Sequence, residues 1–278
     1  VWKLESLGIN TFSIEFSPDE TSFKKLSIWL SSSDWSISKL EKFSSWFTPL
    51  ADQFGFIISF PQWEQVTQED WSSFWKKDWK PDPLGENLLI LPAWLDIPEN
   101  FINRKVIRID PGSAFGTGSH DSTRLCLQAL EKEPPRGSEV VDIGCGSGIL
   151  GLTALRLGAK KVFAVDIDSL AVQATKNNFL LNNFDHNSLS VWKGSIETLH
   201  LKLQRKKVDL ILCNILAPVI KQLIYGFDQI LELDGVALLS GILVEQIPDL
   251  AKTLQTYGWK ITSSCENNNW SLIQVCRY

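Results

Sequence analysis

Short apolar runs alternate with helically spaced apolar residues along the part of the chain after residue 138. The first run, Val140, Val141 and Ile143, is typical of a parallel strand that helices cover on both faces. Further runs predict strands at residues 161–166, 188–193, 208–213, 236–240, 260–265 and 270–276. Amphipathic segments between them predict helices at residues 149–157, 169–182, 218–231 and 245–257. This alternation predicts a doubly wound α/β domain, and the last two strands are close enough in sequence for an antiparallel edge hairpin.

The front of the chain has a different pattern, which predicts a small α+β unit. Apolar and polar residues alternate over residues 10–16, as in a half-buried strand, and apolar residues at helical spacing predict a helix over residues 38–54. Pro49 is expected to disturb the last turns of that helix. Two more short strands are expected at residues 26–30 and 56–60.

A tryptophan-rich segment over residues 67–80 predicts a connecting helix with one apolar stripe. Thr67 and Asp70 resemble a capping box at its start, and Pro81 and Pro83 end it. The stripe consists of aromatic residues at helical spacing, namely Trp71, Phe74, Trp75 and Trp79. Two strands are expected next, at residues 87–91 and 105–109. The predicted organisation is therefore a domain of residues 1–62, a helical linker of residues 63–80 and a second domain of residues 81–278.

Composition favours a globular protein with a substantial core. The chain has 278 residues, of which 44% are hydrophobic, enough for one large or two modest domains. No stretch approaches the roughly 18 to 20 uninterrupted apolar residues of a membrane span, and the first residues do not resemble a secretory signal. We therefore expect a cytoplasmic protein without a membrane segment.

Charge is distributed unevenly, which bears on possible partners. Residues 1–100 contain eight Lys and Arg against fifteen Asp and Glu, whereas residues 101–278 contain nineteen against seventeen. An acidic front half is poorly suited to phosphate backbones, because their binding grows with each Lys or Arg contact, so direct nucleic-acid recognition is not expected. The acidic excess could serve to bind a basic partner protein or only to keep the protein in solution, and the sequence leaves both interpretations open. Five cysteines without a C-x-x-C pair and three histidines do not predict a metal site.

The first candidate site is the glycine-rich turn between the strand that ends at Ile143 and the helix that starts at Ile149. Gly144 and Gly146 remove side chains where a ligand must come close, and the N–H groups of the first helical turn point at that ligand. The turn also fits the dinucleotide fingerprint G-x-G-x-x-G, which holds a pyrophosphate. Asp142 argues against that reading, because a carboxylate favours a ligand that carries ammonium and sulfonium groups.

Asp166 ends the following strand and is placed to accept hydrogen bonds from two ribose hydroxyls. The alternative is that Asp166 and Asp168 merely cap the next helix. The acid, the glycine turn and the second acid together resemble the pattern of class I S-adenosylmethionine-dependent methyltransferases.

The second candidate site is the loop of residues 110–123, which contains three glycines. Loops this rich in glycine are usually functional. Thr123 falls in the first turn of the helix that follows, where its hydroxyl can reach a cofactor carboxylate or ammonium. Ser119 or Asp121 capping that helix is the simpler interpretation, and the two roles can coexist.

Three motifs together resemble the PrmA family, the methyltransferases of ribosomal protein L-eleven. They are Asp110-Pro-Gly-Ser-Ala-Phe-Gly-Thr-Gly-Ser-His-Asp-Ser-Thr123, Val141-Asp-Ile-Gly-Cys-Gly-Ser-Gly-Ile-Leu150 and Asn214-Ile-Leu-Ala217. The likeness covers residues 65–278 well and the first sixty residues loosely. The family usually has Pro-Thr-Thr after the loop histidine, and of these this chain keeps only the final threonine, Thr123.

The resemblance implies a small ferredoxin-like domain that recognises the substrate, a helical linker, and a seven-stranded Rossmann-like methyltransferase domain. The implied cofactor is S-adenosyl-L-methionine, and the implied substrates are lysine side chains and the N-terminal α-amine of ribosomal protein L-eleven. Site residues expected at the cofactor are Thr123, Asp142, Gly144, Gly146, Asp166, Asn214 and Phe115. Phe115 lies in the glycine-rich loop, which would shield the reacting amine from water.

Asn214 is the residue expected to carry the chemistry. It directly follows a predicted buried strand, and it is similar to the Asn-Pro-Pro-aromatic corner of amino-group methyltransferases. Ile215 and Leu216 replace the two prolines, which disfavours a flat nucleobase amine as substrate. An asparagine carbonyl can accept a hydrogen bond from an amine N–H without adding charge. The alternative is a polar residue that only ends the strand, and His120 is a candidate base by proximity alone.

Other functions share parts of this pattern. A methyltransferase of another protein, of RNA or of a small-molecule amine would have the same turn, a dehydrogenase would bind NAD, and a scaffold would bind the cofactor without catalysis. The acidic front half disfavours RNA and Asp142 disfavours NAD.

Overall fold

The computed structural model describes residues 4, 9, 11–16, 23–53, 55, 58–65, 79–110 and 118–278. The chain divides into two compact units, Val1–Asp78 and Trp79–Tyr278. Residues 111–117 of the glycine-rich loop lie outside the described residues, as do residues 66–78, most of the predicted connecting helix.

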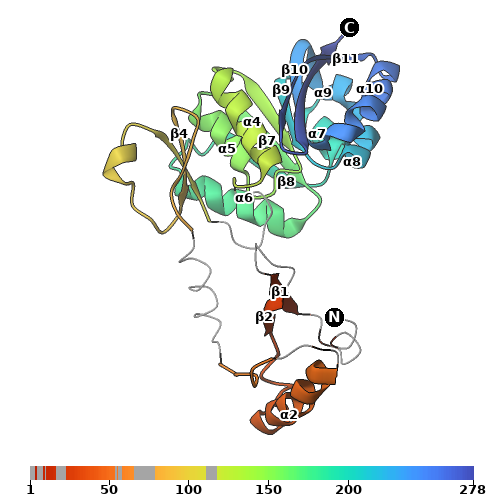
Figure 1. Cartoon of the computed structure of the whole chain (residues 1–278). Coiled ribbons are helices and arrows are strands. Elements are labelled where there is room, and N and C mark those ends of the chain that lie inside the picture. The colour runs from red at the N-terminus through yellow and green to blue at the C-terminus, as the bar shows by residue number, and fades with distance from the viewer. Residues whose placement is uncertain are drawn as a thin grey trace. The chain divides into compact units, whose positions relative to one another are not determined.

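The larger unit contains a seven-stranded sheet, which confirms the predicted fold class (Figure 1). Its strands are β6 (Glu139–Ile143), β7 (Lys161–Asp166), β8 (Leu189–Lys193), β9 (Val208–Asn214), β10 (Leu231–Leu243), β11 (Trp259–Asn267) and β12 (Trp270–Arg277). Their order across the sheet is β11-β12-β10-β9-β6-β7-β8. β12 pairs antiparallel with both β10 and β11, so the predicted hairpin lies at the edge. The chain reverses its direction of travel across the sheet between β6 and β9, where α/β folds form ligand sites.

Helices cover both faces of this sheet. They are α4 (Asp121–Lys132), α5 (Ile149–Arg156), α6 (Ser169–Leu181), α7 (Ile196–Leu203), α8 (Ala217–Leu223), α9 (Phe227–Ile230) and α10 (Ile247–Thr256). The prediction missed α7 entirely. The single helix predicted over residues 218–231 was also wrong, because a 3-10 turn, η3 (Ile224–Gly226), separates α8 from α9. A further 3-10 turn, η4 (Val244–Gln246), precedes α10.

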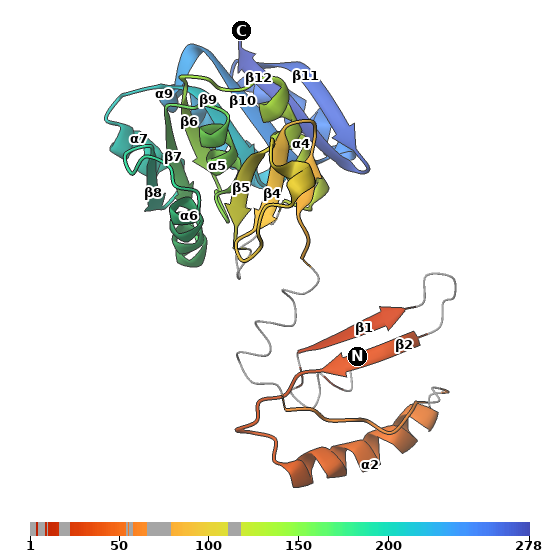
Figure 2. The same cartoon turned by 90° about the vertical axis from the view of Figure 1, so that its left-hand side faces the viewer.

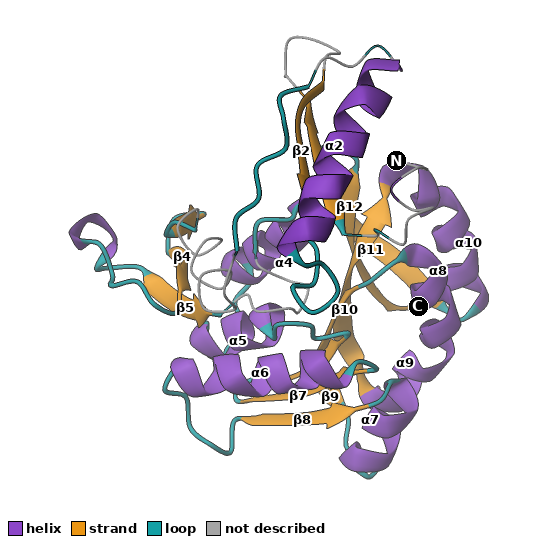
Figure 3. Ribbon diagram, turned by 90° about the horizontal axis from the view of Figure 1, so that it is seen from below, coloured by secondary structure: helices purple, strands orange, loops and turns teal. Residues whose placement is uncertain are grey.

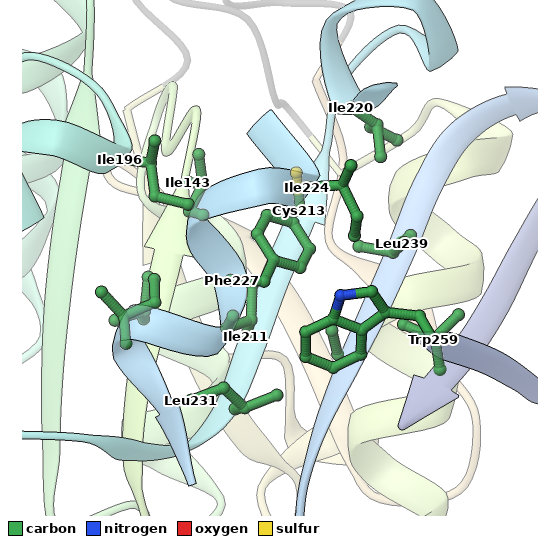
Figure 4. Close-up of a cluster of buried hydrophobic side chains, with 14 of the residues drawn as sticks. Ile143, Ile196, Ile211, Cys213, Ile220, Ile224, Phe227, Leu231, Leu239 and Trp259 are labelled. Atoms are coloured by element: carbon green, nitrogen blue, oxygen red, sulfur yellow. The ribbon is translucent and has the colours of Figure 1, made fainter. Parts of the chain in front are cut away.

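Alternate residues of each strand serve two separate cores, because successive side chains of a strand point to opposite faces. One core lies under α7, α8, α9 and α10, where Phe227 and Trp259 are fully buried with ring centroids 6.0 Å apart (Figure 4). The other lies under α4, α5 and α6 and receives Val140, Val162 and Leu212. Asp142 and Asn214 fall on this second face by the same alternation.

A small three-stranded sheet packs on the second core beside α4 and α5 (Figure 2). It contains β3 (Asp82–Leu84), which the pattern did not predict, β4 (Leu88–Pro92) and β5 (Lys105–Ile109), with a 3-10 turn, η2 (Glu99–Phe101), between the last two. β4 is buried at all five positions, whereas only alternate residues of β5 are buried. This sheet leads the chain into the glycine-rich loop.

The smaller unit contains a hairpin and a helix in its described part (Figure 2). β1 (Phe12–Phe16) pairs antiparallel with β2 (Phe23–Ile28), and α2 (Ile37–Gln53) includes Pro49. Phe43 of α2 is buried at the centre of an aromatic cluster, with ring centroids 5.3 Å from Phe47 and 5.6 Å from Trp35. Residues 58–60 are irregular, so the strand predicted over residues 56–60 was wrong there. The ferredoxin-like arrangement stays a prediction.

Candidate active site

The glycine-rich turn joins β6 to α5 at the carboxyl edge of the sheet. Gly144, Gly146 and Gly148 have φ of +71°, +54° and +84°, a region that side chains disfavour. The N–H groups of Gly144 and Cys145 donate to the carbonyl oxygen of Val165 at 2.9 and 3.1 Å, which ties the turn to β7. The turn therefore has a backbone shape that only glycine adopts readily.

Asp142 lies beneath this turn. Its side chain is 1% exposed, and its Oδ2 accepts a hydrogen bond from the Gly151 N–H at 3.0 Å. The pKa of Asp142 is raised to about 7, mainly by burial and also by the negative charge of the neighbouring Asp166, although the hydrogen bond from the Gly151 N–H acts to lower it. The structure shows this carboxylate bound to the first turn of α5. That Asp142 also faces a cation stays a prediction.

Asp166 lies at the end of β7 beside the turn. Its Oδ2 accepts from the Gly146 N–H at 3.0 Å and its Oδ1 accepts from the Asp168 N–H at 2.9 Å. Asp168 caps α6 by accepting from the Leu170 N–H at 2.8 Å. The capping interpretation thus holds for Asp168, whereas Asp166 braces the glycine turn. Each oxygen of Asp166 still has acceptor capacity for a hydroxyl donor.

Two residues of α6 donate hydrogen bonds to backbone carbonyls of the glycine-rich turn. The sequence pattern did not identify them. The Thr175 hydroxyl donates to the Gly146 carbonyl oxygen at 2.9 Å, and Nδ2 of Asn178 donates to the Ser147 carbonyl oxygen at 2.9 Å. Both side chains are 1% exposed. Buried polar residues on the apolar face of a predicted helix were the signal that could have found them.

Asn178 of α6 and Asn182, the residue that caps its C-terminal end, also hold the edge of β5; Figure 3 shows the two elements in the fold. Oδ1 of Asn178 accepts from the Asp110 N–H at 2.8 Å, and Oδ1 of Asn182 accepts from the Arg108 N–H at 2.9 Å. Nδ2 of Asn182 donates back to the Arg108 carbonyl oxygen at 2.8 Å. These two side chains, one helical turn apart, replace the strand that the open edge of β5 lacks. They also fix Asp110, where the glycine-rich loop begins.

Asn214 and Thr123, which are 91 residues apart, meet on the α4 face of the sheet. Nδ2 of Asn214 donates to the Thr123 hydroxyl oxygen at 3.1 Å, and Thr123 is 1% exposed. The amide nitrogen of Asn214 is therefore engaged, and its carbonyl oxygen Oδ1 is the group that can accept from a substrate. The structure thus brings together two residues that the sequence assigned to one site.

The start of α4 is held by several polar contacts. Nδ1 of His120 accepts from the Ser122 N–H at 3.3 Å and lies 2.8 Å from the Ser122 hydroxyl. Both carboxylate oxygens of Asp121 accept from side-chain amides, those of Asn267 at 3.0 Å and Asn268 at 2.8 Å. His120 therefore caps α4, an arrangement that does not favour its role as a general base.

The remaining predicted contact, Phe115, lies outside the described residues, as do Gly112 and Gly116. Gly118, the last glycine of the loop, is described: its φ is +95°, and an added Cβ would lie 3.0 Å from Cδ1 of Ile149. The end of the loop therefore packs against the first residue of α5, next to the glycine turn.

Three cysteines surround this region without forming a nucleophile. Burial raises the pKa of the Cys126 thiol to about 12 and also raises the pKa of Cys145 and Cys213. Within the described part of the chain, His, Cys, Asp and Glu form no group of three or more suited to a metal ion. No described helix has the length and apolar character needed to span a membrane.

Comparison with known proteins agrees with the predicted family. The family model "Ribosomal protein L11 methyltransferase (PrmA)" matches residues 33–277. A ribosomal protein L11 methyltransferase from Prochlorococcus marinus (strain MIT 9313) is 50% identical over 277 residues, which are 100% of this chain and 92% of that protein. The protein of that name from Parasynechococcus marenigrum (strain WH8102) is 48% identical over 100% of this chain and 96% of its own length.

A solved structure shows the same relationship. The ribosomal protein L11 methylase from Lactobacillus delbrueckii subsp. bulgaricus is 33% identical, with a TM-score of 0.65 over 72% of this chain and 99% of that chain. The family prediction made from the three motifs is thereby confirmed. The chain belongs to the PrmA family, the ribosomal protein L11 methyltransferases.

Proposed function

We propose that this protein transfers methyl groups from S-adenosylmethionine to amino groups of ribosomal protein L11, at lysine side chains and the N-terminal α-amine. Its family makes it an S-adenosylmethionine-dependent protein methyltransferase. The observation that supports an amine as acceptor most directly is the contact between Asn214 and Thr123, because it leaves an uncharged carbonyl oxygen for a substrate N–H. We place the activity in the cytoplasm.

The residues around the glycine turn suit this cofactor. Gly144 and Gly146 have positive φ, which gives the turn a shape that side chains disfavour. Asp166 is only partly buried, and its two oxygens can accept ribose hydroxyls in addition to their backbone donors. We assign Thr123 and Phe115 to the same ligand as predicted contacts. When bound, S-adenosylmethionine supplies an already activated methyl group.

Asp142 suits a cationic ligand at longer range. A positive charge near the turn favours the ionised carboxylate, whose pKa burial has raised to about 7. A pyrophosphate would instead oppose ionisation of the same group. We therefore infer that Asp142 contributes both a fixed backbone contact to Gly151 and a negative charge beneath the cofactor.

The protein's remaining task is to present a neutral amine in line with the methyl group. A lysine with a pKa near 10.4 is uncharged in only about one molecule in a thousand at pH 7, a handicap of roughly 4 to 5 kcal/mol. Oδ1 of Asn214 can accept from the amine N–H, which directs the nitrogen lone pair away from the asparagine. His120 is engaged at the start of α4, so we propose that the amine loses its proton to water.

The test is to incubate the protein with S-adenosylmethionine labelled on its methyl group and with purified large-subunit proteins and ribosomal RNA, each separately. Label on L11 alone is the expected result. Label on RNA, on another protein or on nothing would contradict the proposal. Offering L11 both free and within the large subunit would show which form is the substrate.

A further inference from the structure

β10 contains an irregularity directly beside the Asn214 corner. Its pairing with β12 shifts between Leu239, opposite Ile273, and Ile242, opposite Ser271. Three steps along β10 thus match two steps along β12, so β10 has one extra residue, as in a β-bulge. Gly241 lies in this bulge with φ of +77°.

The backbone of Ile215 packs against the bulge. A Cβ added to Gly241 would lie 2.6 Å from the carbonyl oxygen of Ile215, 2.8 Å from its carbonyl carbon and 3.0 Å from its nitrogen. These are backbone atoms, so they cannot move aside as a flexible side chain can. The Ile215 N–H also donates to the Ser240 carbonyl oxygen at 3.1 Å, which fastens the two segments together.

A second glycine makes room for the side chain of the same residue. A Cβ added to Gly144 would lie 2.6 Å from Cγ2 of Ile215. Ile215 therefore lies between the glycine-rich turn and the β10 bulge, and the residue that faces it on each side is a glycine, Gly144 or Gly241. Asn214 directly precedes Ile215 in the chain. The distance between the Ile215 backbone and β10 therefore affects the direction of the Asn214 side chain.

We infer that Gly241 is a positioning residue for methyl transfer. Its missing side chain lets the Ile215 backbone seat against β10, and this holds Asn214 in the orientation in which Nδ2 reaches Thr123. The inference rests on the proposed function, because it names a residue that acts through Asn214. Gly241 itself contacts neither reacting atoms nor cofactor in this account.

A purely structural role for Gly241 would have a different signature. Its positive φ alone makes any substitution strained, so lost stability proves nothing about Asn214. Gly137 provides a matched control, since its φ is +75° but an added Cβ would meet no atom within 4 Å. Gly137→Ala therefore reproduces the backbone strain without touching Ile215.

The experiment compares Gly241→Ala with Gly137→Ala in the full chain. Melting temperature, calorimetric Kd for S-adenosylmethionine, and kcat and KM with L11 are measured for both variants. A small displacement of an aligned group costs on the order of tenfold to a hundredfold in rate. We expect such a loss in kcat for Gly241→Ala only, with its cofactor Kd within about threefold of the parent protein's and with melting temperatures lowered similarly.

Gly241→Asn is the second variant, because asparagine tolerates positive φ better than alanine but carries the same Cβ. It should fold more readily and still lose kcat. The inference is overturned if either folded variant keeps the kcat of Gly137→Ala. It is also overturned if neither variant folds, since the glycine would then serve the strand itself. An inactive parent protein would instead contradict the proposed function.

Discussion

At the scale of single residues, the site depends on side chains that already have one hydrogen-bonding partner. Asp166 braces Gly146, Asn214 is engaged by Thr123, and Asp142 holds Gly151. Each keeps part of its capacity for a ligand, and each is oriented before the ligand arrives. Pre-organisation of this kind lowers the cost of aligning two reactants.

Asp166→Ala should weaken the binding of S-adenosylmethionine, because both the ribose acceptors and the brace on Gly146 are lost. We expect the calorimetric Kd to rise by about tenfold or more, as for the loss of hydrogen bonds to a charged group. Asp168→Ala is the matched control, because the Asp168 carboxylate accepts from the Leu170 N–H at the start of α6, and the backbone N–H that it donates to Asp166 is kept in the variant. Equal affinity for both variants would remove Asp166 from the cofactor site.

Asp142 should give the protein a particular dependence of stability on pH. Burial raises its pKa from 3.8 to about 7, so the folded state binds a proton more tightly than the unfolded state does. Its stabilising contribution is thus fully present below pH 3.8 and is lost as the pH rises to about 7.

The measurement is the free energy of unfolding of the parent protein and of Asp142→Asn, by urea titration between pH 4 and pH 8. We expect the parent's stability, relative to the variant, to fall by roughly 3 to 5 kcal/mol over this range. Most of the change should come below pH 7. A difference between the two proteins that does not vary with pH would show that the carboxylate titrates normally.

At the scale of elements, α6 connects the parts of the site. Through Thr175 and Asn178 it holds the glycine turn, and through Asn178 and Asn182 it holds the open edge of β5. The two asparagines do for β5 what a neighbouring strand would do. This explains why buried amides occupy a helix face that otherwise packs on apolar residues.

Asn182→Ala should destabilise the larger unit by about 1 to 3 kcal/mol, because the backbone N–H and carbonyl of Arg108 lose their partners. Asn177→Ala is the matched control on the same helix, where the exposed side chain bonds only to Gln173 among the contacts described. Chemical denaturation gives both values. Equal stability of the two variants would show that the hydrogen bonds between Asn182 and Arg108 do not stabilise the unit.

The elements also show what the sequence could and could not predict. Strands with continuous apolar runs, such as β6 and β9, were found within a residue or so, because burial on both faces leaves a strong pattern. α7 was missed because a helix of 8 residues is too short for the helical spacing of its apolar residues to repeat clearly. The break between α8 and α9 has no proline, and only Gly226 marks it.

The site was predictable where one motif contains both the turn and its ligand groups. Gly144, Gly146 and Asp166 belong to one local pattern, and the structure joins Gly146 to Asp166 by a hydrogen bond. Thr123 and Asn214 were each assigned to the cofactor, but their direct contact was not predicted. That these residues bind the cofactor stays a prediction. The α6 amides and the bulge at Gly241 were not predicted, because their partners lie 31 to 74 residues away or on another strand. Local patterns do not record such contacts.

At the scale of the whole molecule, the chain divides into two compact units with separate cores. The larger unit contains the complete seven-stranded sheet and every described residue assigned to the site. We propose that residues 1–62 recognise the substrate and that residues 63–80 connect them to the enzyme domain.

Residues 79–278 alone should bind S-adenosylmethionine with a Kd close to that of the full chain. They should not methylate L11 at a comparable rate, because the proposed recognition domain is missing. Calorimetry with the cofactor and a rate measurement with L11 test the two halves separately. Normal methylation by the shortened protein would show that the first domain does not recognise the substrate.

The most direct test of the account is the intact mass of L11 after incubation with S-adenosylmethionine and one of three proteins, the parent, Asn214→Ala or Asn177→Ala. The parent and Asn177→Ala should add whole numbers of methyl groups at similar rates. Asn214→Ala should be slower by about a hundredfold, although its cofactor Kd stays within about threefold. A parent protein that binds the cofactor but leaves L11 unchanged, or an Asn214→Ala variant as fast as the parent, would contradict the account.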